Sequence, residues 1–378
     1  MARIGLDIDE AIYQATGIGQ MIRMLVRGLL EIAPEHDYVL VYADQGRHPD
    51  FVDPAQVELC PIHLPRRPLY RMLWPLAGWP PVEAFTGPLD LFHVLNADQQ
   101  IPTRCPYIVT VHDLFPELHP QHYKATGRWL RRSLIEQMRH APHLIAISEA
   151  VRQESIDLLK LSPERITQAP LALPPAFESK APDVSVLAEF DLETAGYFLC
   201  VGRVSWRKNT DNILRAFALY CSRYATSHKL VLAGSHSVHA NQIFRLIDEL
   251  HLGDRVIRTG YLPDTAIMGL YKNALAFVFP SRHEGFGMPV LEAQHYGVPV
   301  ISSTAGALPE VSSGSALLVN PESPAELCEA MYCVASCSSL RQELVEKGFH
   351  NLARFDWRQH AVVSAQLYAR LLSAAGSN

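Results

Sequence analysis

The sequence lacks the features that mark several large classes of protein. Its seven cysteines are odd in number and irregular in spacing, which excludes a disulfide framework and a Cys-x2-Cys metal site. It contains no run of roughly eighteen uninterrupted apolar residues, so we expect no membrane-spanning helix. The opening residues, Met1 to Glu10, include acids and no long apolar stretch. We therefore expect no signal peptide and a reducing cytoplasm.

Charge of one sign is also scarce. The formal net charge is −6, with 33 Lys and Arg against 39 Asp and Glu, which gives no sign of nucleic-acid binding. The Gly-x4-Gly-Lys-Ser/Thr spacing of a Walker loop is absent, and we find no Asp-x-Asp element in a nucleotide-binding context. What is present is a chain of 378 residues with 48% hydrophobic content, enough for two domains with sizeable cores.

Short apolar strands alternate with periodic helices, a pattern typical of doubly wound parallel sheets. The first half contains a predicted helix, Gly19 to Ile32, and predicted strands at Ile4–Asp7, Tyr38–Tyr42, Leu91–Val94, Tyr107–Val111 and Leu144–Ile147. The second half contains predicted strands at Tyr197–Val201, Lys229–Ala233, Val256–Thr259, Ala276–Phe279, Val298–Ser302 and Ala316–Val319. Pro163 to Pro182 carries five prolines and is predicted to be a linker. We expect two Rossmann-like α/β domains, residues 1–175 and 184–355, that face each other across a cleft.

The most informative segment is FPSRHEGFGMPVLE, Phe279 to Glu292, which holds two carboxylates eight positions apart. A strand runs into a Gly-Phe-Gly loop, and Pro289 suits the first turn of a helix. The free N–H groups of such a helix bind anions or sugar hydroxyls. We expect Glu284 in the loop and Glu292 on the first turn of the helix, although an ordinary first-turn acid would fit the same spacing.

A second segment has the same strand-to-helix character. The predicted strand Tyr197–Val201 continues into GRVSWRKN, Gly202 to Asn209, in which Arg203 and Lys208 flank the loop. A guanidinium fork and a compact ammonium suit a diphosphate. A solvated basic loop is the alternative.

These two motifs occur in order, followed by GALPEV and preceded by VTVHDLFP and IAISEAV. Together they resemble the retaining GT-B glycosyltransferases of family 4, a group that includes many bacterial mannosyltransferases. The resemblance extends from the Thr16–Gly19 loop to the final helix. The chain departs from the family at Leu171-Ala172, where Asn-Gly is usual, and at Gln20, where a basic residue is common. Both departures concern the acceptor side.

The resemblance implies where the reaction takes place. It implies a nucleotide-sugar donor on the second domain, an acceptor on the first, and a C-terminal helix, residues 356–378, that packs back on the first domain. It also implies retention of anomeric configuration. We expect no metal and no cofactor, because cationic side chains and helix N–H groups would stabilise the departing diphosphate in place of a metal. The catalytic residues would be Glu284, His112, Arg203 and Lys208. Further donor contacts would come from Gly202, Gly260, Tyr261, Leu262, Gly285, Phe286, Gly287, Val290, Leu291 and Glu292, and an acceptor or phosphate loop from Thr16, Gly17, Ile18 and Gly19.

Individual roles follow from the same resemblance. Glu284 would contact the donor sugar near the reacting centre, and Glu292 would bind the ribose hydroxyls. Arg203 and Lys208 would hold the diphosphate, His112 would reach the sugar, and the nucleotide base would lie against Gly260 to Leu262. A lone histidine after a strand is otherwise a structural loop residue. Ser148 and Glu149 are explained fully as the start of a helix.

The acceptor is indicated only by the segment Leu64 to Pro81. It mixes basic and interfacial aromatic side chains, namely Arg66, Arg67, Arg71, Tyr70, Trp74 and Trp79. This mixture suits the surface of an anionic membrane, where a lipid-linked acceptor would be presented. A proline-rich surface loop whose tryptophans pack inward is the alternative.

The predicted function is a cytoplasmic hexosyltransferase, and peripheral attachment to the inner face of the membrane is a further expectation. It would move mannose from GDP-mannose onto a lipid-linked or polysaccharide glycan. A UDP-sugar-dependent transferase and a non-catalytic nucleotide-sugar-binding protein are the alternatives.

Overall fold

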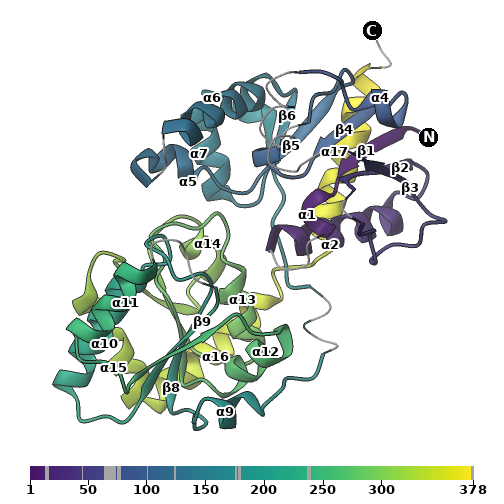
Figure 1. Ribbon diagram of the computed structural model, residues 1–378. Helices are drawn as coiled ribbons and strands as arrows, with labels where there is room; N and C mark the ends of the chain where they lie inside the picture. The colour runs from purple at the N-terminus through teal and green to yellow at the C-terminus, as the bar shows by residue number, and fades with distance from the viewer. Residues whose placement is uncertain are drawn as a thin grey trace. The chain divides into compact units, whose positions relative to one another are not determined.

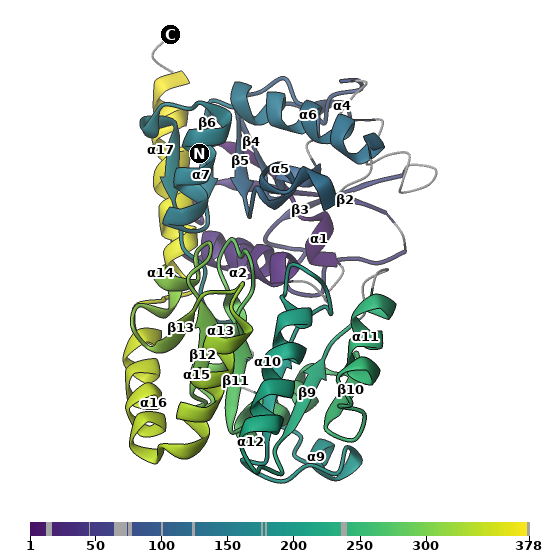
Figure 2. The same ribbon diagram turned by 90° about the vertical axis from the view of Figure 1, so that its left-hand side faces the viewer.

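The chain forms two compact units (Figures 1 and 2). Unit 1 comprises Met1–Pro174 and Asp356–Asn378, and unit 2 comprises Pro175–Phe355. The computed structural model describes residues 1–12, 17–44, 46–63, 74, 78–99, 101–122, 125–174, 177, 180–235 and 240–375. Within these ranges, no helix combines the length and the apolar character needed to cross a membrane.

Unit 1 contains a seven-stranded parallel sheet in the order β3-β2-β1-β4-β5-β6-β7. Its strands are β1 Arg3–Asp7, β2 Asp37–Ala43, β3 Glu58–Ile62, β4 Leu91–Val94, β5 Tyr107–Val111, β6 His143–Ala146 and β7 Ile166–Gln168. Its helices are α1 Asp9–Ile12, α2 Gly17–Ile32, α4 Glu83–Thr86, α5 Phe115–Leu118, α6 Ala125–His140, α7 Glu149–Leu159 and α17 Gln359–Ala375. Strand order reverses between β1 and β4, as in a doubly wound sheet.

The last helix, α17, packs against α2 within unit 1 (Figure 1). A Cβ atom on Gly28 of α2 would lie 2.6 Å from the Cβ of Ala361, so only glycine allows the two helices this close approach. Two buried histidines also attach α17 to the unit. His93 Nδ1 lies 2.6 Å from the hydroxyl of Tyr368, and His360 Nδ1 donates to the Ala169 carbonyl at 2.9 Å.

Unit 2 contains a six-stranded parallel sheet in the order β10-β9-β8-β11-β12-β13. Its strands are β8 Tyr197–Val201, β9 Lys229–Ala233, β10 Val256–Gly260, β11 Ala276–Phe279, β12 Val300–Ser303 and β13 Ala316–Val319. Its helices are α9 Val186–Glu189, α10 Thr210–Arg223, α11 Ala240–Glu249, α12 Asp264–Asn273, α13 Met288–His295, α14 Leu308–Ser312, α15 Pro324–Ser336 and α16 Ser338–Leu352.

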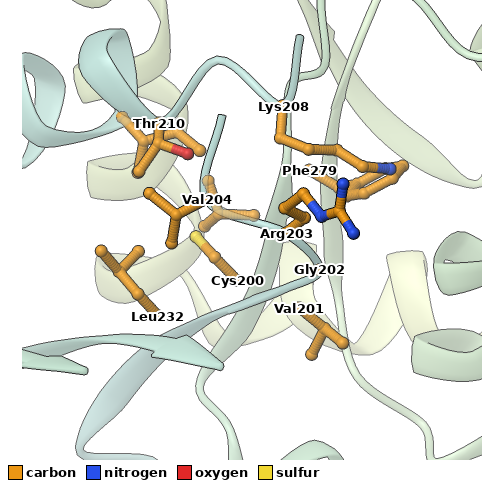
Figure 3. A pocket seen from close by; sticks show the side chains of 11 residues that line it. Cys200, Val201, Gly202, Arg203, Val204, Lys208, Thr210, Leu232 and Phe279 are labelled. Atoms are coloured by element: carbon orange, nitrogen blue, oxygen red, sulfur yellow. The ribbon is translucent and has the colours of Figure 1, made fainter. Parts of the chain in front are cut away.

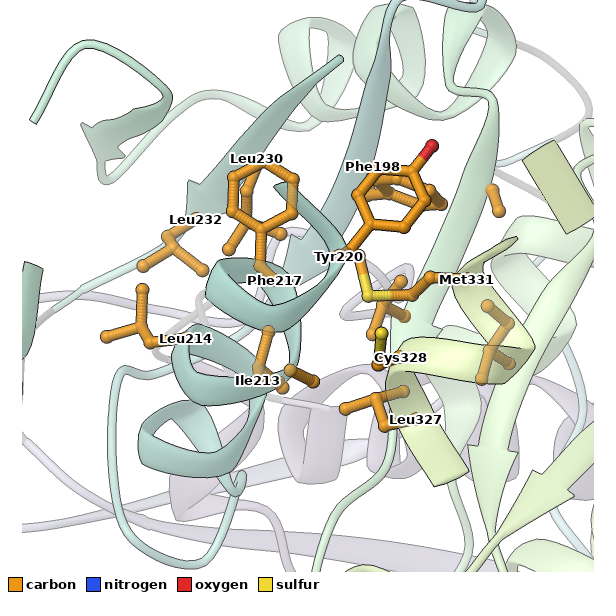
Figure 4. Packing of buried hydrophobic residues seen from close by; sticks show 14 of the residues in the cluster. Phe198, Ile213, Leu214, Phe217, Tyr220, Leu230, Leu232, Leu327, Cys328 and Met331 are labelled. Carbon is orange, nitrogen blue, oxygen red and sulfur yellow. The ribbon is translucent and has the colours of Figure 1, made fainter. Parts of the chain in front are cut away.

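The core of unit 2 lies between its sheet and the helices α10 and α15 (Figure 4). Phe217 and Tyr220 of α10 pack with Phe198 of β8, and Cys328 and Met331 of α15 belong to the same buried cluster. Parallel strands are covered on both faces, which explains why β8, β9 and β11 are almost continuous apolar runs.

The eleven predicted strands are all present, with ends shifted by at most two residues, but two further strands were missed. Strand β7 lies inside the predicted linker and pairs with β6, Ile166 opposite Leu144. The linker prediction was therefore wrong for the first part of Pro163 to Pro182. The strand has only three residues between flanking prolines, too few to show a period. Strand β3 contains Pro61 and lies at the sheet edge, where a strand tolerates proline.

Candidate active site

The two motif loops meet at the topological switch point of unit 2. Strand order reverses between β8 and β11, so the chain leaves these neighbouring strands in opposite directions at their carboxyl ends. In open α/β sheets, ligands bind in the crevice that this reversal creates. The loop after β8 is Gly202–Asn209, and the loop after β11 is Pro280–Gly287. The topology thus brings together Lys208 and Glu284, which are 76 positions apart in the sequence.

Glu284 is a buried carboxylate held by two cations. Its side chain is 9% exposed, Lys208 Nζ donates to its Oε1 at 2.7 Å, and an Arg207 guanidinium nitrogen lies 3.6 Å from its Oε2. Burial raises the pKa of Glu284, but the charges of Lys208 and Arg207 outweigh burial and lower that pKa below its usual value. Glu284 is therefore ionised at neutral pH. The Lys208 ammonium also lies 4.5 Å from the centre of the Phe279 ring.

Arg207 is a site residue that the sequence interpretation missed. We selected Arg203 and Lys208 from the loop, whereas Arg207 and Lys208 are the two cations beside Glu284. Arg203 is exposed, and it lines a pocket together with Gly202, Lys208 and Phe279 (Figure 3). The adjacent pair Arg207-Lys208 was visible in the sequence, but only the fold shows which guanidinium points at the carboxylate.

Arg282 is a second residue to which the sequence analysis gave no role, and it connects the loop after β11 to the loop after β8. Its guanidinium makes a bidentate contact with Asp211 at 2.7 and 3.0 Å, and its Nε donates to Glu322 at 2.6 Å. The same group stacks 4.6 Å from the Trp206 ring. The backbone N–H of Arg282 donates to the Arg207 carbonyl at 2.9 Å. The acidic partners are 71 and 40 positions away in sequence, so no local pattern could reveal them.

The GALPEV segment supports the backbone of Glu284. The N–H of Ala307 donates to the Glu284 carbonyl at 3.0 Å. Gly306 has φ +55°, and a Cβ atom there would lie 2.5 Å from the Glu284 carbonyl oxygen. Glycine is required at this position by both the backbone angle and the close approach.

Three glycines line up along the carboxyl edge of the neighbouring strands. The N–H of Gly202 donates to the Ala233 carbonyl at 2.9 Å, and the N–H of Gly234 donates to the Gly260 carbonyl at 2.9 Å. A Cβ atom on Gly234 would lie 2.3 Å from the Gly202 carbonyl oxygen. Tyr261 follows Gly260 with its side chain 70% exposed, and Leu262 is half-buried.

Glu292 lies on α13, but in its second turn. The helix begins at Met288 and has no acid in its first turn, so the first-turn prediction was wrong by one turn. Tyr271 of α12 donates its phenolic hydrogen to Glu292 Oε2 at 3.0 Å. Burial is the main reason that the pKa of Glu292 is raised to about 7. This carboxyl therefore differs from Glu284 in its ionisation.

The loop before α13 and the later part of its first turn are buried. Gly287 precedes the helix with φ +112°, and the predicted contacts Gly285, Phe286, Val290 and Leu291 are buried around it. The N–H of Val290, one of the expected donor contacts, donates to the Gly287 carbonyl at 2.9 Å. A phosphate that binds Val290 would have to replace that acceptor.

The remaining predicted residues belong to unit 1. His112 follows β5, and its Nε2 lies 2.8 Å from the Leu95 carbonyl. Because a carbonyl only accepts, Nε2 carries the hydrogen, and Nδ1 is the acceptor of the neutral ring. Burial lowers the pKa of His112 and keeps it neutral. Gly17, Ile18 and Gly19 form the first turn of α2 instead of a loop before it, and Thr16 lies outside the described residues.

The segment Leu64 to Pro81 is described only in part. Arg66, Arg67, Tyr70 and Arg71 lie outside the described residues. Trp74 is buried, with its indole N–H donating to the Pro80 carbonyl, whereas Trp79 is 71% exposed. Trp74 therefore fits the alternative of a loop whose tryptophans pack inward, whereas Trp79 does not.

Family models match both halves of the chain. The model for Glycosyltransferase Family 4 matches residues 15–176, and that for Glycosyl transferases group 1 matches residues 189–351. The chain belongs to the group 1 glycosyltransferases. Members of this group use nucleotide-sugar donors, and both motif loops of this glycosyltransferase lie in the group 1 match. The predicted family is confirmed.

Relatives of this glycosyltransferase include bacterial mannosyltransferases. It is 28% identical over 270 residues to O-antigen chain mannosyltransferase B of Escherichia coli, a match that covers 70% of each chain. It is 26% identical over 303 residues to the serotype-specific mannosyltransferase WbdA of Escherichia coli, which covers 78% of this chain but only 37% of WbdA.

Solved structures of glycosyltransferases share the fold along the whole chain. Sucrose-phosphate synthase from Thermosynechococcus elongatus superposes with a TM-score of 0.77 at 20% identity, covering 99% of this chain and 100% of that one. WaaG, a glycosyltransferase involved in lipopolysaccharide biosynthesis, superposes with a TM-score of 0.74 at 16% identity, covering 96% and 99%. The predicted GT-B fold class is confirmed.

Proposed function

We propose that this glycosyltransferase transfers mannose from GDP-mannose to a lipid-linked or polysaccharide glycan, with retention of configuration and without a metal. The observation that carries the chemistry is the ion pair between the half-buried Lys208 and the buried Glu284 at the switch point of unit 2. The choice of mannose and of a glycan acceptor rests on the O-antigen mannosyltransferase relatives.

The proposed step exchanges one C–O bond for another at the anomeric carbon. The bond from the sugar to the diphosphate breaks, and its electron pair stays on the departing phosphate oxygen. The acceptor hydroxyl attacks the same face, and its proton passes to that phosphate oxygen. Because the leaving group takes the proton, this step needs no separate protein base.

Positive charge on the protein stabilises the departing diphosphate. Lys208 has three N–H donors, so it can keep its contact with Glu284 and also bind a phosphate oxygen. The exposed Arg203 also lines this pocket, so its guanidinium is accessible for a second contact with the diphosphate. Losing one such preorganised donor typically costs about 3 to 4 kcal/mol in the transition state.

Carboxylates would recognise the two ends of the donor. Glu284, ionised beside Lys208, would accept hydrogen bonds from the sugar hydroxyls near the reacting carbon. Glu292 would accept from the ribose hydroxyls, and the base would lie against the exposed Tyr261. His112 of unit 1 would offer Nδ1 as an acceptor to the donor sugar.

We also propose that the segment Leu64 to Pro81 attaches the enzyme weakly to the cytoplasmic face of an anionic membrane. The exposed Trp79 supports this proposal, and the three arginines of the segment supply the required charge. A lipid-linked acceptor would then be presented at that surface.

A donor panel tests the proposed reaction. Release of nucleoside diphosphate should be fastest with GDP-mannose when it is compared with UDP-glucose and UDP-N-acetylglucosamine. Faster turnover of a UDP-sugar would assign the UDP-dependent alternative, and binding without any turnover would favour a non-catalytic protein.

Two further readouts test the mechanism. Proton NMR of the product should show the anomeric configuration of the donor, and excess chelator should leave the rate unchanged. An inverted product, or a rate abolished by chelator and restored by Mg²⁺ or Mn²⁺, would overturn the corresponding part of the proposal.

A further inference from the structure

We infer that Tyr271 is a positioning residue for nucleotide binding, and that its buried hydroxyl orients the Glu292 carboxylate toward the ribose. The inference rests on the proposed ribose contact of Glu292. It adds a residue from a different helix, α12, to which the sequence motifs assign no role.

The geometry around Tyr271 is rigid. The residue is fully buried, and its hydroxyl lies 3.0 Å from Glu292 Oε2. Its ring lies edge-on to Phe277 at 5.2 Å between centroids and parallel to Tyr296 at 6.1 Å. Rings on two sides prevent the phenol from turning away, so the hydroxyl has one position, and the carboxylate that accepts from it is held with it.

This contact leaves most of the carboxylate available to a ligand. An ionised carboxylate accepts at about four lone-pair sites, and Tyr271 occupies only one of those on Oε2. Two vicinal ribose hydroxyls need two acceptors. A carboxylate that is already oriented loses little conformational freedom when they bind, which favours affinity.

The hydrogen bond from Tyr271 also affects the ionisation of Glu292. Burial is the main cause that raises the pKa of Glu292 to about 7, and the charge of Asp264 on α12 adds to it. The hydrogen bond from Tyr271 and the charge of Lys208 act in the opposite direction. Tyr296 directly follows α13, and its pKa is raised first by burial and second by the charge of Glu292.

Nucleotide affinity should therefore depend on pH. Ribose hydroxyls donate to the ionised carboxylate, so nucleotide binding favours that form. Affinity should rise as pH increases through the free-enzyme pKa of about 7 and level off above it. Without the Tyr271 hydroxyl, the pKa of Glu292 is higher, and the midpoint of this rise moves to higher pH.

Calorimetry of GDP and UDP binding between pH 6 and pH 9 tests the inference. Tyr271→Phe keeps the ring and removes the hydroxyl. We expect its midpoint to rise by about one pH unit and its affinity at pH 7 to fall about five-fold, with a smaller loss at pH 9. The matched control is Tyr197→Phe, because Tyr197 is also fully buried and donates to the Leu270 carbonyl at 2.6 Å, away from Glu292. It should keep the wild-type midpoint.

The outcomes separate this inference from the function on which it rests. If Tyr271→Phe keeps the wild-type midpoint, the inference is overturned, even if the variant melts at a lower temperature, because that result shows a structural role only. Glu292→Gln should weaken binding and remove the pH dependence. If Glu292→Gln binds nucleotide like the wild type, the proposed ribose contact fails first.

Discussion

At the scale of single residues, the cations of one loop have different environments. Lys208 and Arg207 neutralise a carboxylate that the fold has buried, whereas Arg203 is exposed at the pocket. A buried charge that loses its partner is costly, but an exposed charge is not. Substitutions of these residues should therefore separate stability from catalysis.

Lys208→Ala should lower both the transfer rate and the stability, and Arg203→Ala should lower only the rate. We expect rate losses of about 100-fold or more for each, from the lost diphosphate contact. Lys208→Ala should also lower the unfolding free energy by about 1 to 3 kcal/mol, because Glu284 loses its closest partner. Initial rates and urea unfolding measure the two effects, with Arg215→Ala on the exposed side of α10 as control. Near-normal transfer by the Arg203/Lys208 double alanine variant would show that these two residues do not bind the diphosphate.

Substitutions of Glu284 and Glu292 should affect the binding of different parts of the donor. Glu284→Gln should leave affinity for free nucleoside diphosphate within about two-fold and slow transfer by about 100-fold or more, because Glu284 would contact only the sugar. Glu292→Gln should weaken free nucleotide and intact donor alike. Calorimetry together with steady-state kinetics makes the comparison. Equal losses of nucleotide affinity in both variants would contradict the division.

At the scale of secondary-structure elements, the site depends on loops that approach each other closely. The loop before α14 contacts the backbone of Glu284 through Gly306 and Ala307. Arg282 connects the loop after β11 to helix α10 through Asp211. Neither Arg282 nor the loop before α14 supplies a proposed substrate contact, yet both determine where Glu284 lies.

Gly306→Ala should be strongly destabilising and should reduce transfer. The added Cβ would overlap the Glu284 carbonyl oxygen, and φ is +55°. Gly314→Ala is a matched control, because Gly314 has φ +81° but nothing within 4 Å of its added Cβ. The control should show only backbone strain of about 1 to 2 kcal/mol in urea unfolding, and Gly306→Ala should exceed it clearly. Equal destabilisation would mean that the contact with Glu284 is unimportant.

At the scale of the whole molecule, unit 1 is built from both ends of the chain. Helix α17 returns after unit 2, and its polar contacts with unit 1 include neutral histidines. Burial is the main cause that lowers the pKa of His360 and of His143 to about 4, and Arg370 of α17 lies 3.2 Å from His143 Nδ1. In the unfolded chain both histidines bind a proton near pH 6.5, but in the folded protein they stay neutral until about pH 4. Their effect on stability is therefore negligible above pH 6.5, and the free energy of unfolding falls as pH decreases from 6.5 toward 4.

The apparent Tm should therefore fall between pH 7.5 and pH 5. His360→Asn retains an N–H donor for the Ala169 carbonyl but cannot be protonated, so its pH dependence should be shallower by about 2 to 4 °C. Differential scanning calorimetry checks the slope, with His350→Asn on the exposed side of α16 as control. Parallel curves for wild type and His360→Asn would exclude this histidine as a source of acid sensitivity.

Membrane attachment would also be a property of the whole molecule. Replacing Arg66, Arg67 and Arg71 by Gln should remove about 1 kcal/mol of attraction per charge at an anionic surface. Sedimentation with anionic vesicles at low salt should then decrease, and transfer to a lipid-linked acceptor should slow. Transfer to a short water-soluble acceptor should be retained. Equal sedimentation of wild type and triple variant would leave this segment an ordinary surface loop.

Much of the fold was predictable because its signals are local. Apolar runs marked eleven strands, and the loops GRVSWRKN and EGFGMP marked the carboxyl edge of unit 2. Ser148 caps α7 as expected, accepting from the Val151 N–H at 3.1 Å. Strands β3 and β7 were missed because prolines in or beside them hide the period. The turn that carries Glu292 was misplaced because the helix starts only after Gly287.

The sequence by itself determined the family, the order of eleven strands, and the residue types at the site, because each of these signals is carried by short local segments of the chain. The tertiary structure alone decided which of them meet. It selected Arg207 as the second cation on Glu284, placed Arg282 on Asp211 and Glu322, and put Tyr271 on Glu292. These contacts join residues 21 to 77 positions apart, as from Arg207 to Glu284. Burial raises the pKa of both carboxyls, and only at Glu284 do two adjacent cations outweigh it; both effects exist only once the sheet has brought its helices and loops together.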